Sequence, residues 1–143
     1  TCALPICAST LQYADVILVG VSRTSKTPTC IYLANRGIKA ANIPMVPNVP
    51  LPEELFQISG PLIVGLIASP DRLVHIRKNR LLSLNEDTET EYVDIEAVRA
   101  ELVAAHRLFA ERGWPVIEVT RRSIEETAAE VLALYKRSEQ HVQ

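Results

Sequence analysis

The residues best suited to chemistry stand close together near the start of the chain. Gly20, Lys26 and Thr27 have the spacing of the G-x-x-x-x-G-K-[ST] pattern. In that pattern, backbone N–H groups at a helix N-terminus and the lysine hold phosphate, and the hydroxyl holds Mg²⁺. Ser25 departs from the pattern, which has its second glycine there. We therefore expect a phosphate-binding loop with Lys26 as its catalytic cation, the alternative being a polar turn that holds a lysine. The other residues of the expected loop are Val21, Ser22, Arg23 and Thr24.

Further candidates follow later apolar runs. Asp71 could bind on the magnesium side or act as the base that takes a hydroxyl proton. It could equally stabilise the first turn of a helix through the helix dipole. Arg121 and Arg122 could clamp phosphate in bidentate fashion or lie in a solvated turn. One predicted helix carries a basic face formed by Arg77, Lys78 and Arg80. We expect this face to be solvated rather than to dock an acidic or phosphorylated partner.

Alternating strand and helix signals would position these residues. Apolar runs at 14–21, 41–46, 62–68 and 114–120 predict strands, and the nearly continuous run 14–21 is typical of a parallel strand buried on both faces. Their alternation with helices predicts an α/β fold, a P-loop-kinase-like layer with a mainly parallel sheet flanked by helices. Ligands of such sheets bind outside the carboxyl ends of the strands. Because the candidate residues all follow predicted strands, we expect them to lie at the same edge of the sheet. The expected helices cover 26–37, 52–56, 69–81, 94–113 and 123–135.

Local chemistry marks several helix ends. Pro70 after Ser69 predicts a helix start, and Asp94 predicts another. Gly113 predicts a helix end. Ser123 with Glu126 has the spacing of a capping box, in which the two side chains satisfy each other's backbone N–H groups.

Length and composition indicate one domain. The chain has 143 residues, of which 48% are apolar, which is enough for a core. We expect residues 13–137 to form one nucleotide-binding domain built on the phosphate-binding loop. We leave 1–12 unassigned, either disordered or foreign to this domain, and expect 138–143 to be a frayed tail. The polar stretch 83–91 reads as an exposed loop. Because the chain starts at Thr1 rather than Met, we expect a fragment of a longer protein.

Charge and cysteine content narrow the possible partners. The formal net charge of −2 provides no general attraction to nucleic acid or to anionic lipid. Three cysteines without metal-ligand spacing favour a reducing compartment over a disulfide framework. No apolar run is long enough to span a membrane. We expect a cytoplasmic protein without nucleic-acid or membrane partners.

The loop and its surroundings also resemble one family. The stretch 14–29 is similar to the pyruvate, phosphate dikinase regulatory proteins, relatives of the phosphoenolpyruvate synthase regulatory proteins. Thr24-Ser25-Lys26 looks like the dikinase branch, since the synthase branch tends to have Cys-Gly before the lysine. The likeness extends from Tyr13 to Tyr135 and covers the C-terminal portion of such proteins. The other segments that carry it are 32–37, 40–44, 51–56, 69–73, 76–77, 113–117 and 120–128.

The resemblance implies a bifunctional enzyme. Such proteins transfer the β-phosphate of ADP to a threonine of pyruvate, phosphate dikinase, which inactivates it. They reverse this with inorganic phosphate and release pyrophosphate. By position, the loop 20–27 would bind ADP, with Lys26 stabilising charge on the phosphoryl group and Thr27 orienting Mg²⁺. Asp71 as base and Arg121 with Arg122 as a second clamp are hypotheses from the residues alone.

Other functions remain open at this point. The loop pattern does not reveal how many phosphate groups the bound nucleotide carries. A small-molecule kinase that uses ATP would therefore show the same pattern. A nucleotide-sensing domain without catalysis would also do so. The chain lacks the Asn-Lys-x-Asp signature of guanine recognition, which argues against a GTPase switch. We allow for a homodimer, on which the sequence is silent.

Overall fold

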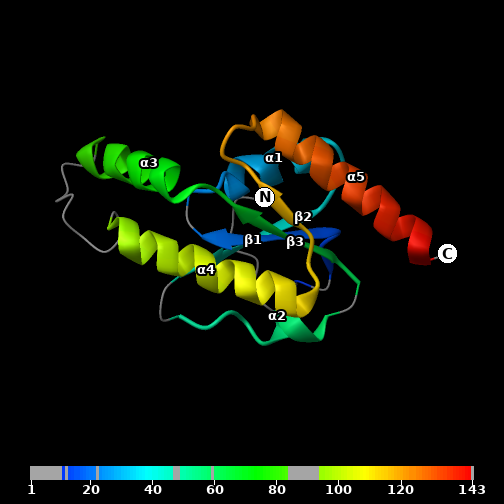
Figure 1. Cartoon of the computed structure of the whole chain (residues 1–143). Helices are drawn as coiled ribbons and strands as arrows, with labels where there is room; N and C mark the ends of the chain where they lie inside the picture. Colours follow the sequence, from blue (N-terminus) through cyan, green and yellow to red (C-terminus); the bar gives the residue numbers. More distant parts are fainter. Residues whose placement is uncertain are drawn as a thin grey trace.

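The fold is a single parallel sheet between two layers of helices (Figure 1). In order along the sheet, the strands are β2, β1, β3 and β4, and each neighbouring pair is parallel. Their bounds are β1 Val16–Val21, β2 Ala40–Met45, β3 Leu62–Ile67 and β4 Val116–Glu118. The expected α/β class with a parallel sheet is therefore confirmed. The computed structural model describes Leu11 and residues 13–21, 23–46, 49–58, 60–83 and 94–142.

Helices cover both faces of this sheet. In Figure 1, α1 and α5 lie on one side of the strands, and α2 and α4 lie on the other. The close contacts agree, because α1 packs on α5 while α4 packs on β1 and β3. Helices α3 and α4 run side by side at one end of the molecule. The helix bounds are α1 Lys26–Asn35, α2 Glu54–Gln57, α3 Pro70–Ser83, α4 Ile95–Arg112 and α5 Ile124–Val142.

The predicted helix caps are present. The Asp94 carboxylate accepts a hydrogen bond from Glu96 N at 3.0 Å and opens α4. Gly113 ends α4 with φ of 69°, a left-handed conformation that favours glycine. At the start of α5, Glu126 N donates to Ser123 Oγ at 3.1 Å, and Ser123 Oγ donates to the Glu126 carboxylate at 3.2 Å. These ends are encoded locally, which is why sequence patterns find them.

The last helix is longer than the sequence suggested. Helix α5 continues to Val142, past Ser138, where we expected a frayed tail. No proline or glycine interrupts this stretch, so the polar composition alone does not stop the helix. The expected exposed loop at 83–91 lies outside the described residues except for Ser83, which belongs to α3.

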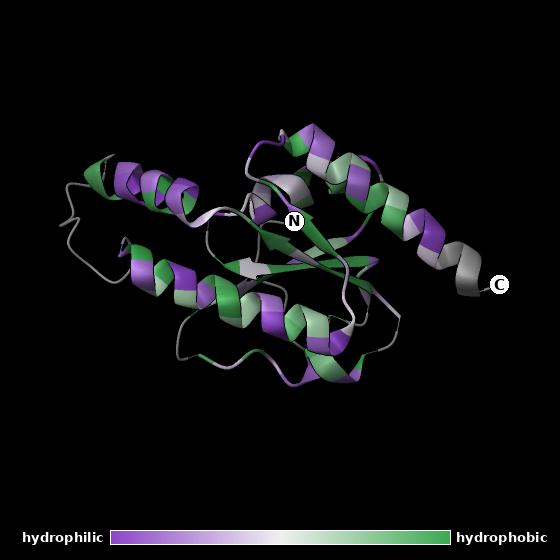
Figure 2. Ribbon diagram, in the orientation of Figure 1, coloured by the Kyte–Doolittle hydropathy of each residue, from purple (hydrophilic) through white to green (hydrophobic). Residues whose placement is uncertain are grey.

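The core follows the apolar strands. Every residue of β1 is buried, as expected for a strand covered on both faces, and the strands are the most uniformly hydrophobic elements in Figure 2. Gly65 of β3 lies directly under the Phe109 ring of α4, where an added Cβ would come within 2.5 Å of the ring. Leu11 is also fully buried, so the core extends before residue 13.

No helix among the described residues is long and apolar enough to cross a membrane.

Candidate functional site

The expected phosphate loop connects the carboxyl end of β1 to α1. Gly20 pairs with Leu66 of the neighbouring strand β3. A Cβ added at Gly20 would lie 2.5 Å from the Leu66 carbonyl oxygen and 3.1 Å from Thr24 Oγ1. Real Cβ atoms do not approach a backbone oxygen so closely, so the first glycine of the pattern is needed for the loop to fold over β3.

Ser25 adopts the backbone conformation that the pattern assigns to glycine. Its φ and ψ are 61° and 27°, in the left-handed region. Arg23 also has a positive φ, of 68°. Side chains other than glycine cost roughly 1–2 kcal/mol in this region because Cβ crowds the backbone. The loop therefore carries backbone strain at two positions, and strain of this kind clusters at functional sites.

Lys26 turns its ammonium into the loop. The residue is only 5% exposed. Lys26 Nζ donates a hydrogen bond to the Val21 carbonyl at 2.6 Å and a second to Thr24 Oγ1 at 3.2 Å. The Thr24 hydroxyl donates to the same Val21 carbonyl at 2.8 Å. The lysine is thus held at the end of β1 by groups of the loop itself.

The environment of Lys26 lowers the pKa of its ammonium group. Burial lowers the pKa of Lys26 from its ordinary value of 10.5 to about 8. An interaction with Cys30 opposes the shift, and the positive charges of Arg77 and Arg23 add to it. An anion placed against the loop would raise this pKa again, because opposite charge favours the protonated form.

A cavity of about 430 Å³ opens beside the loop. Thr27, in the first turn of α1, contributes to it together with a residue that the sequence did not indicate, Asn42 of β2. Asn42 Nδ2 donates to Thr27 Oγ1 at 2.9 Å, a contact between side chains 15 positions apart. The lining residues are Arg23, Ser25, Lys26, Thr27, Pro28, Asn42, Pro44 and Ile76.

The residues of this cavity fit a magnesium ion held with a phosphate ligand. No group of three or more His, Cys, Asp or Glu side chains in the described parts of the chain could hold a metal alone. Mg²⁺ is usually bound by few protein oxygens, with waters and substrate phosphates completing its shell. The Thr27 hydroxyl is an oxygen ligand of the suitable kind, and the Asn42 amide oxygen could accept a hydrogen bond from a water of such a shell.

Asp71 does not line this cavity. It lies exposed in the first turn of α3, which follows β3, and β3 is the direct neighbour of β1. The helix start is fixed by Ser69, whose Oγ accepts from Arg72 N at 3.3 Å. Ser69 N donates in turn to Thr120 Oγ1 at 2.8 Å, which ties the ends of β3 and β4 together.

Arg121 and Arg122 lie in the exposed turn between β4 and α5. Arg122 forms an ion pair with Glu130 of α5. Strand β3 separates β4 from β1, so this turn and the phosphate loop belong to strands about 10 Å apart. The structure therefore places both arginines at the predicted edge of the sheet, outside the cavity beside Lys26.

The expected basic face on α3 is smaller than the sequence suggested. Arg77 is fully buried, and its Nη1 lies 2.7 Å from Glu101 Oε2 of α4. The prediction that Arg77 shares a solvated face with Lys78 and Arg80 is wrong. Charged residues are normally excluded from a core unless they are paired, and the partner is 24 positions away, so no local pattern reveals it.

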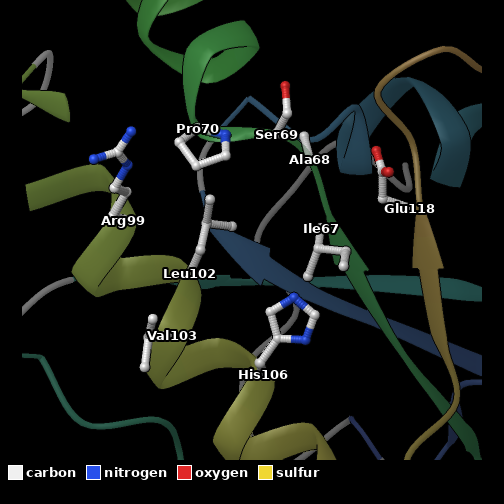
Figure 3. A pocket seen from close by; sticks show the side chains of 9 residues that line it. All are labelled: Ile67, Ala68, Ser69, Pro70, Arg99, Leu102, Val103, His106 and Glu118. Atoms are coloured by element: carbon white, nitrogen blue, oxygen red, sulfur yellow. The ribbon is translucent and has the colours of Figure 1, made fainter. Parts of the chain in front are cut away.

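A second cavity, of about 470 Å³, lies at the same edge of the sheet beside α4 (Figure 3). Its wall is mostly apolar, with Leu102 and Val103 from α4 and Ile67 from β3. The His106 ring lies next to Ile67, whereas Glu118 stands on the far side, on β4. None of the residues expected to bind phosphate is among those that line this cavity.

The fold and the loop define a parallel α/β domain with the pattern of a phosphate-binding loop at its central strands. A family model described as kinase/pyrophosphorylase matches residues 7–132, and the chain belongs to this family.

Three relatives illustrate the match, and each carries the provisional name pyruvate, phosphate dikinase regulatory protein. The one from Caulobacter vibrioides is 67% identical over 124 residues, which cover 87% of this chain and 39% of that protein. The one from Maricaulis maris is 63% identical over 121 residues, 85% of this chain and 43% of that protein. The one from Sphingopyxis alaskensis is 65% identical over 123 residues, 86% of this chain and 46% of that protein. The chain thus spans about two fifths of the length of these relatives.

Proposed function

We propose that this chain belongs to a bifunctional enzyme that regulates pyruvate, phosphate dikinase. The enzyme phosphorylates a threonine of the dikinase with ADP and removes that phosphate with inorganic phosphate. Two findings support this: the family description names a kinase and a pyrophosphorylase, and the relatives carry the name of a dikinase regulator. Because the chain spans about two fifths of those relatives, the proposal concerns the whole protein.

The observation that carries the proposal is the geometry of the loop 20–27, of which all but the predicted phosphate-binding residue Ser22 belong to the described residues. Buried Lys26 and the Thr27 hydroxyl meet beside one cavity at the N-terminus of α1, and the Thr24 hydroxyl accepts a hydrogen bond from Lys26. Phosphoryl transfer depends mainly on positioning and on stabilising the charge of the transferred group. A buried ammonium and a helix N-terminus supply both, because charge interactions are stronger away from water.

In the forward direction, the threonine hydroxyl oxygen attacks the β-phosphorus of ADP. The bond from that phosphorus to the bridging oxygen breaks, AMP leaves with the bond's electrons, and the threonine proton passes to a base. We assign the base to Asp71, which follows the strand beside β1. We assign Arg121 and Arg122 to a second phosphate contact. Mg²⁺ bound with Thr27 would neutralise part of the phosphate charge.

In the reverse direction, inorganic phosphate attacks the phosphorus of phosphothreonine. The bond to the threonine oxygen breaks, that oxygen takes back a proton, and pyrophosphate leaves. The same loop would hold the attacking phosphate, so both reactions depend on Lys26.

The proposal is tested with β-labelled ADP and the dikinase. The chain, and a longer version with the length of its relatives, are each incubated with dikinase, and label is followed into threonine. We expect transfer that Lys26→Ala abolishes in both directions, whereas Lys136→Ala on the exposed surface of α5 leaves it unchanged. Asp71→Asn should slow transfer without unfolding the domain, and unchanged turnover would leave Asp71 as a helix cap.

Other outcomes select the alternatives. Transfer from ATP to a small acceptor, with none from ADP to the dikinase, would replace the proposal by a small-molecule kinase. Nucleotide binding by the longer version without transfer to any acceptor would indicate a sensing domain.

A further inference from the structure

Asn42 stands out because it connects the strand next to β1 with the first turn of α1. It lies on β2 opposite Leu18 and lines the cavity that also contains Lys26. Its Nδ2 donates to Thr27 Oγ1 at 2.9 Å. Within the described residues, its Oδ1 is buried without a hydrogen-bond partner. One end of the amide is therefore engaged, and the other end is an acceptor for which the described residues supply no donor.

We propose that Asn42 is a positioning residue that holds the Thr27 hydroxyl in the orientation needed for a magnesium ion bound with ADP. This inference rests on the proposed nucleotide site. Asn42 touches Thr27 and acts through it, and no reacting atom needs to contact Asn42 itself.

The first step of the argument is the freedom of the Thr27 side chain. A threonine in a helix divides between two rotamers, because its hydroxyl can also bond a carbonyl of the preceding turn. The bond from Asn42 occupies one lone pair of Thr27 Oγ1 and selects one of these arrangements. The second lone pair stays available. Mg²⁺ requires near-ideal placement of its ligands, so a Thr27 hydroxyl that divides between two rotamers would bind it poorly.

The second step is the unpaired amide oxygen. A buried polar atom without a partner costs roughly 1–3 kcal/mol, and native proteins keep few of them. Asn42 Oδ1 is such an atom at the wall of the cavity. Mg²⁺ usually keeps several waters, and a water of that shell is a hydrogen-bond donor. A ligand with its metal would thus satisfy an acceptor that the protein leaves open.

A purely structural role would be to dock α1 onto β2. Loss of such a bond would weaken folding, or would weaken ADP binding equally with and without metal. The positioning role makes a different prediction, because only the metal-dependent part of the affinity should change.

The experiment measures ADP binding by calorimetry, with Mg²⁺ and with excess chelator, for four proteins. These are the wild type, Asn42→Ala, Thr27→Val and the double variant. A neutral hydrogen bond contributes about 1 kcal/mol, so Asn42→Ala should weaken Mg·ADP binding about fivefold. It should leave metal-free ADP binding within about twofold, and the double variant should lose less than the sum of the two single losses. Asn35→Ala, at the exposed end of α1, is the matched control.

Equal losses with and without Mg²⁺, or additive losses in the double variant, would overturn the role of Asn42 and leave the nucleotide site intact. No ADP binding by the wild type under either condition would overturn both the inference and the proposed function. Circular dichroism at the assay temperature checks that each variant is folded. A loss of ADP affinity in a folded variant can then be attributed to the binding site.

Discussion

The depressed pKa of Lys26 predicts that ADP binding weakens as pH rises through the neutral range. In the proposed nucleotide site the charged ammonium of Lys26 holds phosphate, and the pKa of Lys26 in the free protein is about 8. At pH 7 about nine-tenths of the molecules carry that charge, and at pH 9 about one-tenth do. The affinity should therefore fall about tenfold between these pH values. ADP contributes little, since the second pKa of a phosphate monoester is about 6.

The assay is calorimetric titration with Mg·ADP from pH 6.5 to pH 9.5 in buffers of different ionisation enthalpy. At pH 8 half of the free lysines are neutral, so binding should take up about half a proton. Lys26→Arg is the control, because a guanidinium stays charged over this range and should give a flat profile. A wild-type affinity that is constant from pH 7 to pH 9, with no proton uptake, would refute the reasoning.

The same shift fixes the sign of a stability effect. The pKa of Lys26 is lower in the folded chain than in the unfolded chain, so the unfolded chain binds more protons between about pH 8 and 10.5. The contribution of Lys26 to the free energy of unfolding therefore increases as pH rises through this window. Comparison with Lys26→Met by denaturant titration should show this difference in slope.

Three further substitutions test the framework around the site. Ser25→Gly should raise the free energy of unfolding by up to about 1 kcal/mol, because relief of left-handed strain exceeds the entropy cost of glycine. Glu101→Ala should lower it by about 3 kcal/mol, because the buried Arg77 guanidinium loses the Glu101 carboxylate from among its partners. Gly65→Ala should lower it by about 1–3 kcal/mol, because the new methyl group meets an aromatic ring of α4. Urea titration measures all three.

Each of these has a matched comparison. Ser25→Val should destabilise, since β-branched residues are the least tolerant of positive φ. Glu96→Ala removes an exposed ion pair with Arg99 and should change stability by less than about 1 kcal/mol. Gly60→Ala, where no atom lies within 4 Å of the added methyl group, should be close to neutral. If Glu101→Ala and Glu96→Ala cost the same, the buried pair has no special role.

Features with local causes were predictable from the sequence. The capping box at Ser123 and the cap at Asp94 involve side chains that act within a few positions of themselves. Strands β1 and β3 were found because they are continuous apolar runs, as expected of strands buried on both faces. The shorter edge strand β4 has only Ile117 buried, so its apolar signal came partly from the residues around it. The loop was found because Gly20, Lys26 and Thr27 form a motif of fixed spacing, which can be recognised without knowledge of the rest of the fold.

Features with distant causes were not predictable. Parallel pairing joins strands far apart in sequence, and the same apolar runs are compatible with several strand orders. The bond from Asn42 to Thr27 exists only because β2 lies beside β1 and faces α1. Burial of Arg77 likewise depends on α4 bringing Glu101 against α3. The sequence offered one indication of Asn42, namely that it is a polar residue in an otherwise apolar strand. That indication does not identify Thr27 as its partner.

The hydrogen bonds inside the loop have a consequence for the smallest proposed ligand. Ordering a residue of flexible backbone costs about 1–2 kcal/mol, so residues 23–25 would cost about 3–6 kcal/mol if binding had to fix them. ADP has many atoms with which to offset such a cost, but inorganic phosphate has very few. Because Lys26 and Thr24 already hold the Val21 carbonyl, that ordering is completed during folding. These preformed hydrogen bonds would thus matter most for the proposed reaction that starts from free phosphate.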